Sequence, residues 1–293
     1  MNSENDRVET LQRVIDREIE KNPHNQELIN AFRPVMIARA HLLENVKLNQ
    51  TAPASFDEIR FQGGIPLIRQ QRLLFPEDPW EEMAADMIPA MKEGFPAIVD
   101  DMDRLLASRE KIQGLACDYL GVLPDPDEDV IDRWAADLQV GSEGIALLMR
   151  QLIRIILEKR SQDAAKRIKD IEWKKGYCPV CGAFPTIALI EEKITRRWLH
   201  CSRCSHDWLF SRAICPYCEN EAQQGMDFFY VETRAQESAF TCDQCKRYLI
   251  TLNRVSDLHD HDLDVSAISL VHMDIIMQQK GLLPMAACEW NSF

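Results

Sequence analysis

Apolar residues recur every three or four positions along most of the first 170 residues, the pattern of helices with one buried face. One stripe covers 8–19 and ends at Asn22-Pro23, and a second covers 28–43. Because proline removes a helix hydrogen bond, we expect a kink or boundary at Pro34. Further helices are predicted over 80–93, 95–106, 108–120, 128–138 and 143–173, the last with a candidate cap or break at Ser161.

The pattern changes at Gly176, where short β-prone runs begin to alternate with cysteine pairs as far as about residue 255. Helical periodicity returns over 262–281. The sequence therefore predicts an α+β protein, in which an N-terminal α-helical domain precedes two tandem rubredoxin-like or zinc-ribbon β modules and a C-terminal helix. The predicted domains are residues 1–172, 173–213, 214–258 and 259–293.

Eight cysteines form four Cys-x-x-Cys pairs in the β-prone part of the chain. They are Cys178/Cys181, Cys201/Cys204, Cys215/Cys218 and Cys242/Cys245. Two cysteines on one tight turn can direct both sulfurs to the same metal ion, so each pair supplies half of a tetrahedral site. Taken in order, 19 residues separate the first two pairs and 23 separate the last two. The first spacing is that of a four-cysteine zinc site, and the second is slightly longer.

The cysteine block is also an internal repeat. GYCPVCG, a β-prone run and LHCSRCSHDWL are echoed by AICPYCE, a β-prone run and FTCDQCKRYLI. We call each Cys-x-x-Cys turn a knuckle and number the four in chain order. The repeat favours one metal site made by the first and second knuckles and another made by the third and fourth. The less favoured alternative pairs the first knuckle with the third and the second with the fourth. His200 and His206 flank the second knuckle, but they are surplus once eight cysteines are divided into fours.

The expected cofactors are two tetrahedral four-thiolate metal ions per chain. Iron and zinc both accept this ligand set, so the metal stays open. Gly182 favours an amide turned toward sulfur, as in rubredoxin knuckles, whereas Ser205, Glu219 and Lys246 occupy the equivalent positions. Four sulfurs leave no coordination position for water or substrate, and the sequence carries no phosphate loop, HExxH or GxSxG motif. We therefore expect no enzymatic activity.

Composition and charge restrict the class of partner and the compartment. The apolar and charged fractions, 46% and 28%, are those of a globular protein. No apolar run reaches the roughly 18 to 20 residues that span a bilayer, and the acidic N-terminus is not a secretory signal. We expect a cytoplasmic protein that does not engage a membrane, in which reduced thiols favour metal over disulfides. A formal net charge of -13 argues against a polyanionic partner.

The charge is uneven, however, because residues 166–254 hold 14 Lys and Arg against 11 Asp and Glu. A small basic and aromatic patch is conceivable there, and it keeps a nucleic-acid-binding zinc ribbon open as an alternative. Its members would be Lys174, Lys175, Arg196, Arg197, Arg203 and Arg212, with Trp198 and Trp208 nearby.

The segments GYCPVCGAFP, LHCSRCSHDW, CPYCEN and CDQCKRYL resemble the formate dehydrogenase accessory proteins of the FdhE family. The resemblance is specific in the cysteine block and loose over the first 170 residues. It implies a cytoplasmic, non-enzymatic maturation factor that binds the catalytic subunit of a respiratory, molybdenum- or tungsten-dependent formate dehydrogenase. It also implies metal binding by each of the eight paired cysteines. A rubredoxin-like electron carrier is a further alternative, and self-association is left open.

Overall fold

The structure is a computed structural model that describes residues 4–48, 55–115, 128–193, 195–221, 224–231, 234–256 and 261–291. The chain divides into two compact units. The first comprises Met1–Arg13, Asn30–Ala54 and Gln71–Arg160, and the second comprises Val14–Ile29, Ser55–Gln70 and Ser161–Phe293. Three helices contribute residues to both units, namely α1 (Glu4–Lys21), α2 (Gln26–Asn45) and α8 (Ser142–Ile168).

The first unit is helical, as the periodicity predicts. Besides its parts of α1, α2 and α8 it contains α4 (Trp80–Gly94), η3 (Pro96–Ile98), α5 (Val99–Ala107), η4 (Arg109–Lys111) and α7 (Glu128–Leu138). The predicted boundary at Pro34 is wrong, because α2 continues through it. The predicted break at Ser161 is wrong as well, because α8 is continuous to Ile168. The helix predicted over 108–120 lies partly outside the described residues.

A buried ion pair stabilises the first unit. Arg160 donates to both carboxylate oxygens of Asp78, at 2.7 and 2.6 Å, and to the carbonyl of Leu73 at 2.7 Å. The guanidinium also lies over the Phe75 ring, 4.7 Å from its centroid. Asp78 accepts a further hydrogen bond from the Phe75 amide at 2.9 Å. These donors satisfy the hydrogen-bonding capacity of a carboxylate that is buried in an apolar core.

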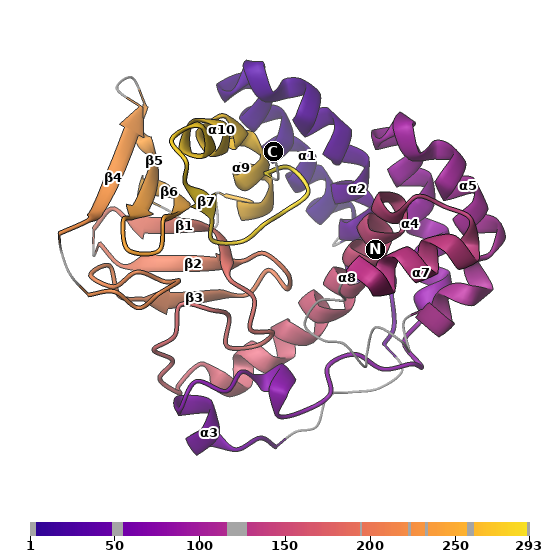
Figure 1. Cartoon of the computed structure of the whole chain (residues 1–293), viewed down its shortest axis with the longest axis horizontal. Helices are drawn as coiled ribbons and strands as arrows, with labels where there is room; N and C mark the ends of the chain where they lie inside the picture. Colours follow the sequence, from indigo (N-terminus) through magenta and orange to yellow (C-terminus); the bar gives the residue numbers. More distant parts are fainter. Residues whose placement is uncertain are drawn as a thin grey trace. The chain divides into compact units, whose positions relative to one another are not determined.

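The second unit is built around a seven-stranded sheet. Its strands are β1 (Pro185–Glu191), β2 (Arg197–Cys201), β3 (Asp207–Phe210), β4 (Met226–Val231), β5 (Arg234–Cys242), β6 (Arg247–Val255) and β7 (Leu283–Pro284). The order across the sheet is β3-β2-β1-β6-β5-β4, and β7 pairs with β6 (Figure 1). Each cysteine-bearing half is an antiparallel three-stranded meander, β1-β2-β3 or β4-β5-β6.

The two halves share one sheet because β1 pairs in parallel with β6. Ile187 lies opposite Ile250 in this register, and Leu189 lies opposite Leu252. Equivalent strands therefore run in the same direction, and the repeat proceeds head to tail across the sheet. The α+β class is confirmed, whereas the boundaries at 172/173, 213/214 and 258/259 stay a prediction.

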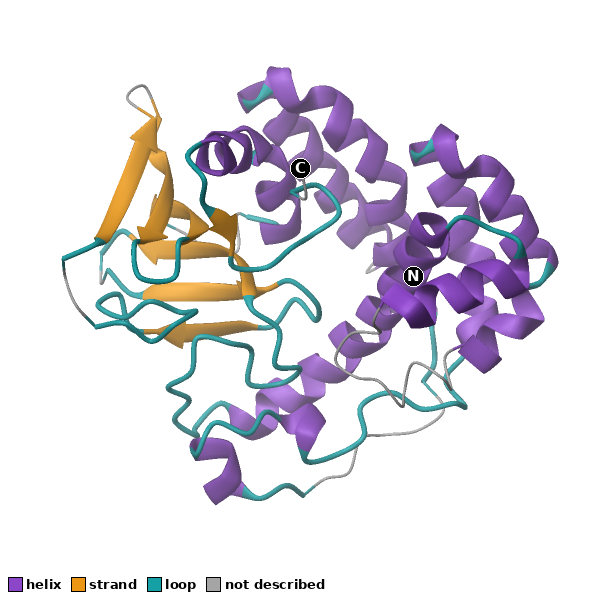
Figure 2. Cartoon of the chain, in the orientation of Figure 1, coloured by secondary structure: helices purple, strands orange, loops and turns teal. Residues whose placement is uncertain are grey.

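The C-terminal helix of the prediction is two helices, α9 (Leu263–Ser269) and α10 (Val271–Gln279), which separate at Leu270. The Asp262 side chain caps α9 by accepting hydrogen bonds from two amides of its first turn, both at 3.1 Å. α9 contacts β1, and α10 contacts β5 and β6. Figure 2 shows these helices in purple beside the orange sheet.

Three short helices complete the second unit. They are η1 (Pro23–Asn25), α3 (Glu58–Gln62) and η2 (Leu67–Arg69). The side chain of Asp57 caps α3. No helix in the described part of the chain is both long enough and apolar enough to cross a membrane.

Candidate metal centres

The first two knuckles meet in one buried group of four sulfurs. Cys178, Cys181, Cys201 and Cys204 are all buried, and their Sγ atoms lie within 4.8 Å of one another. Two of the sulfur–sulfur separations are 3.5 Å (Cys178–Cys204) and 3.3 Å (Cys181–Cys201). A tetrahedron with metal–sulfur bonds of about 2.3 Å has edges of about 3.8 Å, so this group is close to the size that a metal requires.

The third and fourth knuckles form the second group. Cys215 and Cys242 are buried, while Cys218 and Cys245 are half-buried. The Sγ atoms of Cys215 and Cys245 are 3.8 Å apart, and those of Cys218 and Cys242 are 3.7 Å apart. These edges match the tetrahedral expectation of about 3.8 Å. The consecutive grouping predicted from the repeat is the one observed.

The four knuckles share a backbone conformation that composition alone did not predict. The residue after each second cysteine has a positive φ, at Gly182 (77°), Ser205 (52°), Glu219 (59°) and Lys246 (56°). The amide of the first cysteine donates to the carbonyl five residues later in three of the turns, at 2.8 to 3.1 Å. Only the first of these positions is a glycine. We infer that the turn itself enforces the left-handed conformation, which costs about 1 to 2 kcal/mol at each non-glycine position.

Backbone amides also point at the ligand sulfurs. The amides of Arg203 and Cys204 donate to the Sγ atom of Cys201, both at 3.4 Å. In the second group, the amides of Tyr217 and Cys218 donate to the thiolate of Cys215 and favour its charged form. Such hydrogen bonds stabilise a thiolate without supplying a fifth ligand.

Burial makes the thiolate form of these groups costly when no cation is present. It raises the pKa of the Cys178 and Cys204 thiols well above the ordinary range, and it raises the pKa of Cys215 to about 11. Four thiolates in one buried group require a positive centre, because their mutual repulsion would otherwise keep most of them protonated. The chemistry and size of both groups therefore fit a divalent or trivalent ion.

The first site is held by elements distant in sequence. The amides of Leu67 and Ile68 donate to the carbonyls of Pro179 and Val180, both at 2.9 Å, so the segment around η2 runs along the first knuckle. Ser161 Oγ donates to the carbonyl of Cys204 at 3.0 Å, so this residue braces the second knuckle and does not end a helix. Nothing in the sequence linked either segment to the cysteines.

His200 has a role that is not metal ligation. Its Nδ1 lies 2.7 Å from the carboxylate of Asp207, and its Nε2 lies 3.1 Å from that of Asp264. Burial alone would lower the pKa of His200, but the two carboxylates outweigh that effect and raise it to about 10. The charged imidazole thus joins β2, β3 and α9 beside the first site.

The second site borders a buried arginine. Arg197 donates to the carbonyls of Ser211 and Ile214, the latter at 2.6 Å, and Ile214 directly precedes Cys215. Burial lowers the pKa of Arg197 to about 10, and the thiolate of Cys215 opposes that shift. A positive guanidinium is therefore placed where it offsets the net negative charge of four thiolates around a divalent ion.

Close packing connects the two sites. A Cβ added to Gly176 would lie 1.9 Å from the carbonyl oxygen of Pro216, so only glycine permits the approach. The Phe184 and Tyr217 rings lie 4.6 Å apart, and the guanidinium of Arg247 covers the same Tyr217 ring at 4.0 Å. The segment that leads into the first knuckle thus rests on the third.

Fold and sites together define the class of this protein. It is an α+β protein whose sheet carries two four-cysteine groups suited to metal, with the ribbon repeat joined edge to edge. Comparison with known proteins supports a narrower assignment. The sequence profile of the FdhE central domain matches residues 177–212, which contain the first four-cysteine group.

Whole-chain comparisons agree with the domain match. The chain is 26% identical to Protein FdhE of Escherichia coli (strain K12) over 278 residues, covering 90% of this chain and 82% of that protein. It is 32% identical to a Protein FdhE homolog of Aquifex aeolicus over 117 residues, a match that spans 40% of that protein. The crystal structure of the FdhE protein from Pseudomonas aeruginosa shares the fold, with a TM-score of 0.62 at 17% identity, covering 97% of this chain and 95% of that one. The chain is therefore similar to FdhE proteins along most of its length, and its first four-cysteine group lies within the match to the FdhE central domain.

Proposed function

We propose that this protein is an accessory factor that binds the catalytic subunit of a respiratory, molybdenum- or tungsten-dependent formate dehydrogenase and promotes its maturation. The observation that carries the proposal is the pair of complete four-sulfur groups in a chain similar to FdhE proteins. Each group supplies all the ligands of a tetrahedral ion. The sites therefore suit a structural or electron-transfer role better than catalysis on a substrate.

In this proposal the ligands are Cys178, Cys181, Cys201 and Cys204 for one ion, and Cys215, Cys218, Cys242 and Cys245 for the other. The bound ions supply cross-links between strands and, if they are iron, one-electron redox chemistry. The protein is proposed to be non-enzymatic and cytoplasmic, because a reducing compartment keeps eight thiols available to metal.

A capture experiment tests the partner. The affinity-tagged chain is expressed in cells that produce a respiratory formate dehydrogenase, and the retained proteins are identified by mass spectrometry. We expect the catalytic subunit to be retained by the unmodified chain and by a Cys288→Ser control, which changes a buried cysteine outside both groups. Absence of this subunit from both samples would refute the proposed function.

Metal analysis of anaerobically purified protein tests the sites and separates iron from zinc. We expect two ions for each chain, as the two groups in the described residues imply. A red protein that dithionite bleaches would identify iron and support a redox role, since four thiolates give ferric iron a strong visible colour. A colourless protein with two zinc ions would assign the sites a structural role, whereas fewer than one ion of either metal would refute the ligand assignment.

A further inference from the structure

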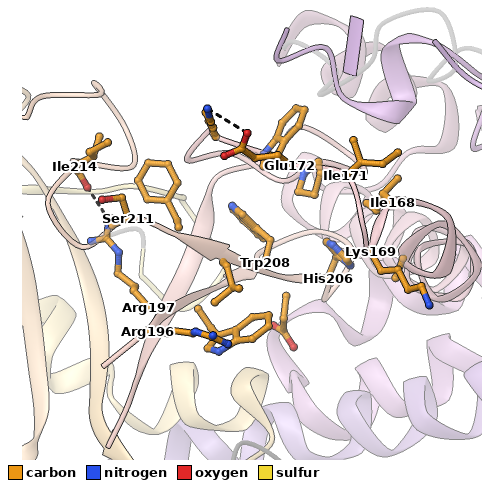
Figure 3. A pocket seen from close by; sticks show the side chains of 18 of the residues that line it. Ile168, Lys169, Ile171, Glu172, Arg196, Arg197, His206, Trp208, Ser211 and Ile214 are labelled. Atoms are coloured by element: carbon orange, nitrogen blue, oxygen red, sulfur yellow. Dashed lines mark hydrogen bonds and ion pairs between the residues drawn. The ribbon is translucent and has the colours of Figure 1, made fainter. Parts of the chain in front are cut away.

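An open groove in the second unit lies beside β3, and none of the eight paired cysteines lines it. Its volume is about 1020 Å³, at the upper end of the roughly 300 to 1,000 Å³ of small-molecule pockets. One wall is residues 206–212, which include all of β3, and the other is the end of α8 with the segment that follows it. Figure 3 shows Trp208 between Arg196 and Lys169. The groove is flanked by basic side chains.

The lining is electropositive in an otherwise acidic protein. It contains five Lys or Arg side chains against two carboxylates. Asp207 pairs with His200 at 2.7 Å, whereas Glu172 pairs with Lys174 of the same lining at 3.2 Å, so these two charges offset each other and the lining as a whole stays positive. Arg196 and Arg212 are exposed, and within the described ranges no ion pair involves either of them. The groove thus complements a ligand that carries several negative charges.

The β3 wall is also an open sheet edge. β3 pairs with β2 alone among the described strands. The amide of Cys201 donates to the carbonyl of His206 at 3.1 Å, so these two residues form a hydrogen-bonded pair. Because such pairs alternate along an antiparallel ladder, the backbone groups of Asp207 and Leu209 point away from β2. The Leu209 side chain is 42% exposed. An edge with outward-facing amides accepts an added strand.

The other half of the repeat shows how a strand sits on this edge. β6 is the counterpart of β3, because each follows the second knuckle of its half. The equivalent edge of β6 is covered by β1 and β7, both in parallel. Ile250 stands where Leu209 stands in β3, and it lies opposite Ile187 of β1. The side of β6 that pairs with β1 and β7 therefore corresponds to the side of β3 that pairs with no described strand.

We propose that this groove binds an extended, acidic peptide segment of a protein partner, which adds to β3 as a parallel strand. Its backbone pairs with Asp207 and Leu209, and its carboxylates meet Lys169, Lys174, Arg196 and Arg212. A single-stranded nucleic acid would suit the basic and aromatic lining, but it has no peptide backbone and cannot form a hydrogen-bonded ladder with β3. The proposal depends on the proposed function only for the identity of that partner.

A binding assay with short synthetic peptides tests the proposal on the full-length, metal-loaded protein. The probe is a fluorescently labelled peptide that alternates Glu and Val, and its anisotropy is measured at low and high salt. Two further peptides carry N-methyl groups, one on the Glu amides and the other on the Val amides. We expect binding of the unmodified probe, weakened by salt. One methylated version should lose about tenfold or more in affinity, because a parallel strand presents one set of amides to β3.

Variants assign the binding to the groove. Arg196→Glu and Lys174→Glu should each lower the affinity for the peptide probe by about tenfold. Lys166→Glu is the matched control and should leave this affinity unchanged, because Lys166 is an exposed lysine outside the groove. Leu209→Pro removes the outward amide and leaves the β2 ladder intact, and it should abolish binding. Leu209→Ala keeps the amide and should retain binding. If Leu209→Pro fails to fold, the methylated peptides still test the ladder.

Several results would overturn the proposal. One is failure of the unmodified probe to bind, and another is equal binding of both methylated peptides and the unmodified one. Tighter binding of an oligothymidylate that displaces the peptide would assign the groove to nucleic acid. A concentration-dependent dimer that is lost in Leu209→Pro would assign the edge to a second copy of this chain. Retention of formate dehydrogenase by Arg196→Glu and Leu209→Pro would overturn the groove as the docking site and leave the proposed function standing.

Discussion

The two four-cysteine groups share their ligands, their knuckle turns and their place in the repeat, yet they differ in burial. All four sulfurs of the first site belong to buried residues, whereas Cys218 and Cys245 of the second are half-buried. The first site is covered by the segment around η2 and braced by Ser161. The second depends on a buried guanidinium and on aromatic packing. One motif therefore gives a closed site and a partly open one, according to what surrounds it.

This difference predicts a division of roles. A buried four-thiolate ion is inaccessible to chelators and oxidants, so the first site suits a permanent cross-link. A half-exposed site exchanges its ion or loses it on oxidation more readily, so the second suits a sensor of metal or redox state. The four predictions below test this comparison.

Loss of one ligand should have the largest effect, and a larger one at the first site. Cys178→Ser should remove one ion and unfold much of the sheet, because metal binding contributes about 10 to 16 kcal/mol in small zinc domains. Cys218→Ser should weaken the second ion while leaving more of the fold intact, since serine at a half-buried position can be hydrated. Metal content per chain and urea unfolding measure both effects. Cys288→Ser is the control, and full metal occupancy in Cys178→Ser would refute the ligand assignment.

Removal of the buried guanidinium should affect the second site alone. Arg197→Met leaves the carbonyls of Ser211 and Ile214 without their donor, which costs roughly 1 to 3 kcal/mol for two hydrogen bonds, because neither residue is fully buried and water can replace part of the loss. It also removes the positive charge beside Cys215, so affinity for the second ion should fall about 10- to 100-fold. Competition with a metal-binding dye measures the affinity. Arg212→Met is the matched control, and equal weakening of both sites would contradict the assignment.

The stability of the fold should depend on pH through a hydrogen bond between β6, the strand that follows the last knuckle, and α10. Tyr248 of β6 donates to Asp274 of α10 at 2.7 Å, and burial raises the pKa of Asp274 from 3.8 to about 7. The folded state keeps a proton that the unfolded state releases. This group therefore stabilises the fold most below the unfolded pKa, and the stabilisation is lost as pH rises from about 4 through about 7. The free energy lost is about 2 to 4 kcal/mol.

The Asp274→Asn variant isolates this effect, because asparagine mimics the neutral acid and accepts the same hydrogen bond. Urea unfolding of the two proteins across that pH range gives the difference in stability, in which the pH dependence of metal binding cancels. We expect the free energy of unfolding of the variant to rise relative to that of the unmodified protein as pH rises. A difference that stays constant with pH would show that Asp274 is already ionised in the fold.

The order of metal release should show the smallest effect. With excess chelator or dilute peroxide, the second ion should leave about tenfold faster than the first, a difference of about 1.4 kcal/mol in barrier. Stopped-flow absorbance with a coloured chelator separates the two phases, and Cys218→Ser should lose the fast one. Release of both ions in a single phase would mean that the shared sheet couples them and that exposure does not decide their lability.

The helical stripes and the eight cysteines were readable from the sequence because both rest on local spacing. Periodicity places α4, α5 and α7 close to their observed ends. The helices continue through Pro34 and Ser161, so the boundary that is one of the two outcomes expected at Pro34, and the break expected at Ser161, are both absent. Ser161 can stay in a helix because its hydroxyl finds an acceptor on a distant knuckle, which no local rule records.

The knuckle turns show a similar limit. Gly182 is the residue that composition associates with a left-handed turn, but Ser205, Glu219 and Lys246 adopt the same conformation. The cost of about 1 to 2 kcal/mol at each is small beside the free energy of closing a metal site, so sequence preference does not determine the backbone there. Residue preference predicts the backbone of a turn only where no larger free energy, such as that of metal binding, constrains the turn.

The sequence by itself determined that this chain has two sets of four sulfurs at metal-binding spacing, because knuckle, repeat and spacing are local or periodic properties. Only the tertiary structure decided that the two halves form one sheet, since the β1–β6 pairing joins residues about 60 positions apart with no spacing signal. It also decided which site is buried and which basic side chains share a groove with an open edge. Burial and shared surface depend on long-range packing, which two chemically equivalent motifs in one sequence do not encode.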